Sequence, residues 1–188
     1  MNREKLFIDL DDTLISNSHT KQVLLECLAG VGFSEEEVRE RYNEARDNNG
    51  FFSPEGYLKA LNASPQQEAL FEQTWKHHRE GIKNGLLPGA LTFLSSIDRS
   101  QFIPTLLTLG NPSYQQDKVS ALGIAGYFEV LHFCTERKDT FLLKLLPHAE
   151  TFTIIDDRED CRQQVRIAFP NAKTYANFSA FEVVAARS

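Results

Sequence analysis

Between residues 100 and 188, segments with the character of β-strands alternate with segments of helical character. Strands are expected at 102–109, 128–133, 151–155 and 172–176, and helices at 112–122, 139–147, 159–168 and 179–186. Such alternation is typical of a parallel sheet whose crossover helices cover both of its faces. The strand segments, such as Thr153-Ile154-Ile155, lack polar alternation, which suits strands buried on both sides. The sequence therefore predicts an α/β fold with a Rossmann-like parallel sheet.

A long helical stretch interrupts this pattern near the N-terminus. One more strand is expected at 5–10, but the next begins only at 102. Helical patterns occupy the residues between them, at 19–31, from Ser34 onward, and at 54–62, 65–84 and 90–98. The simplest architecture is an α/β core made of residues 1–15 and 86–188, with a small helical domain inserted at 16–85.

Composition excludes several classes of protein. The chain has 188 residues, 41% of them hydrophobic and 24% charged, as in an ordinary globular protein. Its net charge of −6 and its lack of a Lys/Arg cluster argue against nucleic acid as a partner. No apolar run approaches the ~20 residues of a membrane span, and the three cysteines form neither a zinc motif nor a disulfide framework. We expect a cytoplasmic protein with no membrane partner; the sequence leaves its oligomeric state open.

Acidic and hydroxyl residues gather where the predicted strands end. The carboxyl ends of parallel strands meet at one edge of the sheet, and ligands bind at that edge in open α/β folds. A lysine at the start of the 139–147 helix is expected at the same edge. In chain order, the candidates are Asp9, Asp11, Thr13, Thr108, Lys138 and Asp156.

These residue types together favour phosphoryl transfer assisted by a metal ion. Crowded carboxylates repel one another and need a cation nearby. A carboxylate can attack phosphorus to form an aspartyl-phosphate, and a second one can act as general acid and base. Oxygen ligands suit Mg²⁺, while a lysine and a hydroxyl can bind the phosphoryl oxygens. The sequence thus predicts Mg²⁺ as cofactor and a phosphate ester as substrate.

The chain resembles the haloacid dehalogenase (HAD) superfamily of hydrolases, whose four motifs occur here in the family's order. The first motif, Asp-x-Asp-x-Thr after a strand, is matched by residues 9–13, and the second, a strand ending in Thr or Ser, by Thr108. The third, a lysine at a helix start, is matched by Lys138. The fourth, an apolar strand with two acids a few residues apart, is matched by Asp156 and Asp160. The helical insert resembles the family's cap domain.

The resemblance implies a role for each matched residue. Asp9 is implied as nucleophile and metal ligand, and Asp11 as general acid/base that also binds the metal through its backbone carbonyl. Asp156 is implied as the third protein ligand of the metal, and Thr108 and Lys138 as phosphate-binding residues. Supporting roles are implied for Thr13, Asp157 and Asp160, the last by orienting Lys138.

The resemblance also ranks the functions that remain open. The dehalogenating branch lacks an acid at the position of Asp11, so a phosphatase acting on a small phosphorylated metabolite is favoured. A phosphomutase uses the same aspartyl-phosphate and stays open as an alternative. A receiver-like signalling domain, or a family member that only binds phosphate or a partner, is the non-enzymatic alternative. Nothing in 16–85 identifies the substrate.

Overall fold

The computed structural model describes residues 3–47, 50–147 and 150–185. The chain divides into two compact units. The sheet unit comprises the described residues of 1–15, 87–109 and 124–188, and the helical unit those of 16–86 and 110–123. The chain therefore passes from the sheet unit to the helical unit twice.

The sheet unit is built on five parallel strands in the order β3-β2-β1-β4-β5. The strands are β1 (Glu4–Ile8), β2 (Phe102–Leu109), β3 (Val130–Cys134), β4 (Phe152–Ile155) and β5 (Lys173–Tyr175). The predicted α/β class and parallel sheet are confirmed, and each strand ends within two residues of its expected limits. The strand order differs from the 2-1-3-4-5 order of receiver domains, so the receiver-like alternative is wrong.

The register of the sheet brings two strand ends together. β1 lies between β2 and β4, and Ile8 at its end is aligned with Leu106 of β2 and Ile155 of β4. Asp9 and Asp156 follow Ile8 and Ile155 in sequence. Both therefore leave the sheet side by side at its carboxyl edge.

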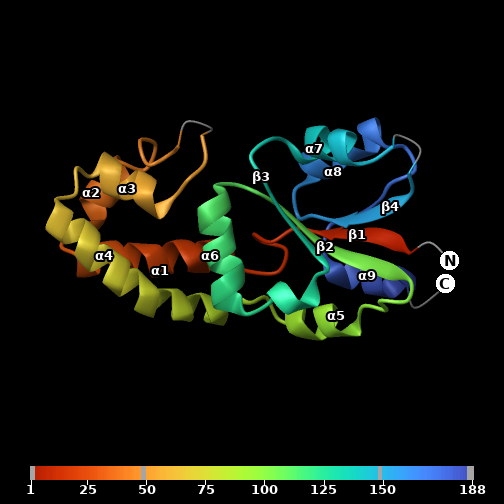
Figure 1. Ribbon diagram of the computed structural model, residues 1–188, viewed down its shortest axis with the longest axis horizontal. Coiled ribbons are helices and arrows are strands. Elements are labelled where there is room, and N and C mark those ends of the chain that lie inside the picture. The colour runs from red at the N-terminus through yellow and green to blue at the C-terminus, as the bar shows by residue number, and fades with distance from the viewer. Residues whose placement is uncertain (1–2, 48–49, 148–149, 186–188) are drawn as a thin grey trace. The chain divides into compact units, whose positions relative to one another are not determined.

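Helices cover both faces of the sheet, as the sequence predicts. Figure 1 shows α7 (Lys138–Leu145) and α8 (Glu159–Ala168) on one face, and α5 (Ala90–Ser96) and α9 (Phe178–Ala185) on the other. Aromatic rings pack on both faces: Phe152 lies edge-on to Phe7 and Phe169 on one, and Phe181 of α9 lies edge-on to Phe102 of β2 on the other. The strands are thus apolar on both sides because both sides are covered.

The helical unit begins with α1 (Asn17–Gly30), α2 (Glu35–Glu40), α3 (Pro54–Ala60) and α4 (Pro65–His78), followed by a 3-10 helix at Arg79–Gly85. Serines cap several of these helices; the Ser34 hydroxyl accepts from the Glu37 amide, and the Glu37 carboxylate accepts from the Ser34 amide. The helix expected at 65–84 changes to a 3-10 helix after His78, in a stretch with two glycines, which are weak helix formers. Among the described residues, no helix is long and apolar enough to cross a membrane.

The helix α6 (Pro112–Leu122) belongs to the helical unit, whereas the sequence places it in the α/β core. Trp75 Nε1 donates to Asp117 Oδ2 at 3.0 Å, and the Tyr114 ring centroid lies 6.1 Å from that of Trp75. An Asn111 amide also donates to Asp47 at 3.1 Å. The assignment of 16–85 as an inserted helical cap domain stays a prediction, and α6 packs with that region.

Candidate active site

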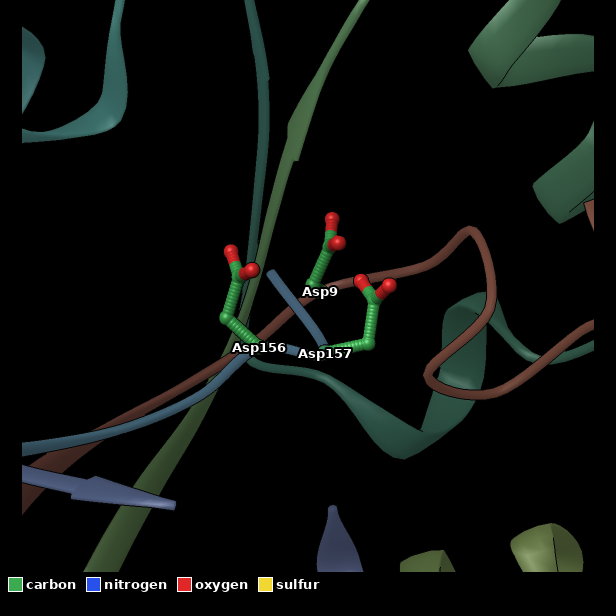
Figure 2. Close-up of side chains that lie close together, drawn as sticks. All are labelled: Asp9, Asp156 and Asp157. Carbon is green, nitrogen blue, oxygen red and sulfur yellow. The ribbon is translucent and has the colours of Figure 1, made fainter. Parts of the chain in front are cut away.

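Asp9 and Asp156 emerge from neighbouring strands and are both buried. The Asp9 amide donates to the carbonyl of Ile155 at 2.9 Å, and the Asp156 amide donates to the carbonyl of Tyr175 at 3.0 Å. Only 7% of Asp9 and none of Asp156 is exposed. Figure 2 shows their carboxylates pointing in the same direction as that of Asp157. The parallel topology thus assembles acids that are about 150 positions apart in the sequence.

A tight turn follows Asp9 and carries Asp11. The strand expected at 5–10 ends at Ile8, because the amides of Leu14 and Ile15 both turn back to the carbonyl of Leu10, at 2.9 and 3.1 Å. Asp12 adopts a left-handed conformation with φ of 55°, which aspartate tolerates better than most side chains. The turn leaves Asp11 half-buried just beyond the nucleophile candidate.

Lys138 joins the two buried acids. It is the first residue of α7, and its Nζ lies 2.6 Å from Asp9 Oδ1 and 2.6 Å from Asp156 Oδ2. Its side chain is only 5% exposed. Buried charges persist when they are paired and hydrogen-bonded, and here one ammonium serves two carboxylates. The structure therefore brings together three of the residues that the sequence singles out.

The buried charges shift one another's pKa. Burial raises the pKa of Asp9 to about 7; the Lys138 ammonium opposes this rise, and the charges of Asp156 and Asp11 add to it. Burial lowers the pKa of Lys138, but the Asp9 and Asp156 carboxylates outweigh it and raise the pKa overall. Burial and the Asp156 charge also raise the pKa of Asp157. The site thus holds more negative charge than Lys138 alone offsets.

The donor set fits a divalent cation. One carboxylate oxygen each from Asp9, Asp156 and Asp157 lies within 4.8 Å of the others, with Asp9 and Asp156 buried and Asp157 exposed. Three carboxylates against one ammonium leave two negative charges uncompensated when all are ionised. Hard oxygen ligands are the set that Mg²⁺ prefers. The sequence names Asp157 only as a supporting residue, and the structure places it in the acidic cluster.

Backbone contacts hold the loop that carries Asp156 and Asp157. The Asp157 amide donates to Thr13 Oγ1 at 3.2 Å, and the Arg158 amide donates to Asp156 Oδ1 at 2.9 Å. The Arg162 guanidinium donates to the Asp156 carbonyl. Sequence reasoning misses Arg162, because an arginine inside a predicted helix is by default assigned to solvent. Thr13 therefore contacts this loop, and the supporting role implied for it stays a prediction.

Thr108 lies at the same edge of the sheet. It is the residue before the last of β2, and it is 1% exposed. Leu106 is aligned with Ile8, so Thr108 lies beside the backbone just beyond Asp9. The thiol of Cys134, at the end of β3, donates to the Thr108 carbonyl at 3.2 Å. This position suits the phosphate-binding role that the sequence suggests, which stays a prediction.

Asp160 is not a member of the acidic cluster. Its carboxylate pairs with the Arg158 guanidinium at 2.5 Å, and more than half of each side chain is exposed. The contacts that orient Lys138 come instead from Asp9 and Asp156. Its pair with Arg158 lies next to the loop, and the supporting role implied for Asp160 stays a prediction.

Comparisons with solved structures agree with this fold. No protein-family profile and no curated protein sequence matches the chain. A protein from Burkholderia xenovorans LB400 described as a haloacid dehalogenase-like hydrolase matches with a TM-score of 0.71 and 17% identity, over 92% of this chain and 83% of that one. The Bacillus subtilis protein YfnB, described as a HAD-hydrolase and bound to magnesium, matches with a TM-score of 0.55 and 17% identity, over 93% of this chain and 86% of that one. A Lactobacillus plantarum protein described as a phosphoglycolate phosphatase matches with a TM-score of 0.50 and 16% identity, over 98% and 99%.

At sequence identities of 16–17%, similarity to these solved structures establishes the fold alone. The chain has the fold of the haloacid dehalogenase-like hydrolases, as its four motifs suggest. Three of the residues that match those motifs, Asp9, Lys138 and Asp156, form a buried ion-paired group at the carboxyl edge of its sheet.

Proposed function

We propose that this protein is a HAD-superfamily phosphatase, which hydrolyses a small phosphorylated metabolite through an aspartyl-phosphate on Asp9 with Mg²⁺ as cofactor. One observation carries the proposal: Lys138 lies 2.6 Å from both Asp9 and Asp156, all three buried at the carboxyl edge of the sheet. A structural ion pair gains little from burying two acids on one lysine, whereas a phosphoryl-transfer site needs this combination. Support also comes from the matched structures, one described as a phosphatase and one bound to magnesium.

The acidic cluster would hold the cofactor. Asp9 and Asp156 would bind through their carboxylates and Asp11 through its backbone carbonyl, with Asp157 beside them in the cluster. Bound Mg²⁺ would neutralise negative charge on the phosphoryl oxygens and on the acids that surround them. A dianionic phosphate could then approach a carboxylate nucleophile, which like charges would otherwise repel.

The chain's own residues carry the proton and bond changes. An Asp9 oxygen attacks phosphorus, the ester P–O bond breaks, and Asp11 gives a proton to the leaving oxygen. Asp11 then takes a proton from water, the water oxygen bonds to phosphorus, and the bond from phosphorus to Asp9 breaks. Lys138 and Thr108 donate to the phosphoryl oxygens in both steps. The products are an alcohol and inorganic phosphate, and Asp9 is regenerated.

Phosphate release from p-nitrophenyl phosphate tests the proposal. We expect turnover with Mg²⁺, loss of turnover with EDTA, and loss of turnover in Asp9→Asn with the fold retained by circular dichroism. Two parallel assays distinguish a phosphatase from a dehalogenase and from a phosphomutase. Chloride release from 2-chloropropionate without phosphate release would make the protein a dehalogenase. Transfer of a phosphoryl group between sugar hydroxyls with little free phosphate would make it a mutase.

A further inference from the structure

Arg162 is a buried arginine next to the acidic cluster. It lies in α8 and is only 8% exposed, although arginine is rarely buried without partners. One guanidinium nitrogen donates to the backbone carbonyl of Asp156, and another donates to the Glu159 carboxylate. A buried charged donor on a carbonyl makes a strong hydrogen bond, because little water competes for either group. Arg162 thus binds the backbone at the base of the cluster.

The carbonyl that Arg162 binds belongs to the peptide group between Asp156 and Asp157. The amide of the same peptide group donates to Thr13 Oγ1 at 3.2 Å. Both polar ends of this planar group are therefore held, one by Arg162 and the other by Thr13, and Thr13 is itself buried. Because a peptide group is rigid, holding both ends fixes the direction in which the chain continues from Asp156 to Asp157.

We propose that Arg162 is a positioning residue for the acidic cluster. By binding the carbonyl of the Asp156–Asp157 peptide group, it fixes how the Asp157 carboxylate is presented beside Asp9 and Asp156, whose oxygens lie within 4.8 Å of it. The inference rests on the proposed function, since it concerns the affinity of that cluster for a divalent cation. Residues that orient metal ligands typically change affinity by about 10- to 100-fold when they are removed.

Arg166 provides a matched control within the same helix. It lies one turn beyond Arg162 and also pairs with Glu159, at 2.6 Å. Its other bond goes to the Thr174 hydroxyl at 2.8 Å, and its side chain is 44% exposed. Removal of Arg166 therefore breaks its own pair with Glu159, whereas the Asp156 carbonyl remains bound to Arg162.

Binding of Mn²⁺ to the full chain, measured by calorimetry and by electron paramagnetic resonance, tests the proposal without relying on turnover. Mn²⁺ takes the same oxygen ligands as Mg²⁺. We expect Arg162→Gln to weaken Mn²⁺ binding by about tenfold or more, and Arg166→Gln to change it by less than about twofold. Far-ultraviolet circular dichroism and urea unfolding show whether each variant is folded at the temperature of the titration.

The same titration separates positioning from general support of the fold. Thr13→Val releases the other end of the same peptide group, so the double variant should lose less affinity than the product of the two single losses. Arg162→Lys retains the charge but cannot bind two acceptors as a fork. If Arg162→Gln does not fold, Arg162→Lys takes its place in the comparison of single and double variants. We then expect the affinity for Mn²⁺ to fall by several-fold. Unchanged affinity in the Arg162 variant, or losses that simply multiply, would overturn the inference. A wild-type chain that does not bind Mn²⁺ would refute the proposed function as well.

Discussion

Ion pairs with nearly equal distances between nitrogen and oxygen differ in burial between the two units. In the sheet unit, Lys138 lies 2.6 Å from Asp9 and from Asp156, and no side chain of the three is more than 9% exposed. In the helical unit, Arg39 lies 2.7 Å from Glu35, but their side chains are 78% and 75% exposed. An exposed pair contributes ~0–1 kcal/mol, whereas breaking a buried pair costs ~3–5 kcal/mol. Burial, and not distance, separates the charges of the proposed active site from a solvated pair.

Substitutions of acids in the two units should differ most in their effect on the rate of phosphate release. Asp9→Asn removes the proposed nucleophile and should lower phosphate release by at least ~1,000-fold, as removal of a nucleophile generally does. Glu35→Gln is the matched change on an exposed carboxylate of the helical unit and should leave turnover intact. Steady-state kinetics with p-nitrophenyl phosphate and Mg²⁺ measure both. Equal effects of the two changes would contradict the assignment of Asp9.

Stability should separate the same two sets of charges. Lys138→Met leaves Asp9 and Asp156 buried without their cation, so we expect the free energy of unfolding to fall by ~3–5 kcal/mol. Arg39→Met should lower it by less than ~1 kcal/mol, because Glu35 remains hydrated. Urea unfolding of the metal-free proteins at neutral pH gives both values. Similar values for the two variants would show that the buried group contributes no more to stability than the exposed pair.

The pH dependence of stability should identify Asp9 within that group. Its pKa is about 7 in the folded protein against 3.8 for an ordinary aspartate, so the folded state keeps a proton that the unfolded state has lost. Asp9 therefore makes the metal-free protein less stable as pH rises from about 4 to about 7. Asp9→Asn should remove this contribution, and its unfolding free energy should fall less over that range than that of the wild type. Parallel pH profiles for the two proteins in EDTA would contradict the assignment.

A smaller effect is expected where α6 joins the helical unit. Trp75→Phe retains an aromatic ring but removes the hydrogen bond to Asp117, which is part-buried and 3.0 Å long. We expect a loss of ~0.5–1.5 kcal/mol in the free energy of unfolding. Asp117→Ala also removes the long, part-exposed pair with Arg79, which contributes ~0–1 kcal/mol. The double variant should therefore cost little more than Asp117→Ala alone. Independent losses would show that the contact does not hold α6 in this unit.

Much of the sheet unit could be predicted from sequence, because its strands are apolar runs that end in polar residues. Parallel topology then places the carboxyl ends of all strands at one edge, so Asp9 and Asp156 are expected at the same edge. That β1 and β4 are neighbours, which puts the two residues side by side, comes from the structure. The approach of Lys138 to this edge of the sheet follows from its place at the start of α7. These predictions depend on local patterns and on one rule of topology.

Other features depend on packing that leaves no local pattern. Arg162 and Arg166 lie one turn apart in α8, and nothing in the sequence indicates that the first is buried and the second exposed. The sequence of α6 fits a crossover helix between two strands, yet its contacts with Trp75 place it in the helical unit. The turn that ends β1 at Ile8 follows from backbone bonds to Leu10, whereas the apolar run alone suggests a longer strand.

Chemical trapping of the intermediate tests the central claim most directly. Enzyme turning over a phosphate ester with Mg²⁺ is quenched in acid, reduced with borohydride and digested, and the peptide that contains Asp9 is sequenced by mass spectrometry. A carboxyl group that carries phosphate is reduced to an alcohol, so the account predicts homoserine at position 9 and aspartate at positions 11 and 156. Steady release of phosphate with an unmodified Asp9, or with the label on another acid, would contradict it.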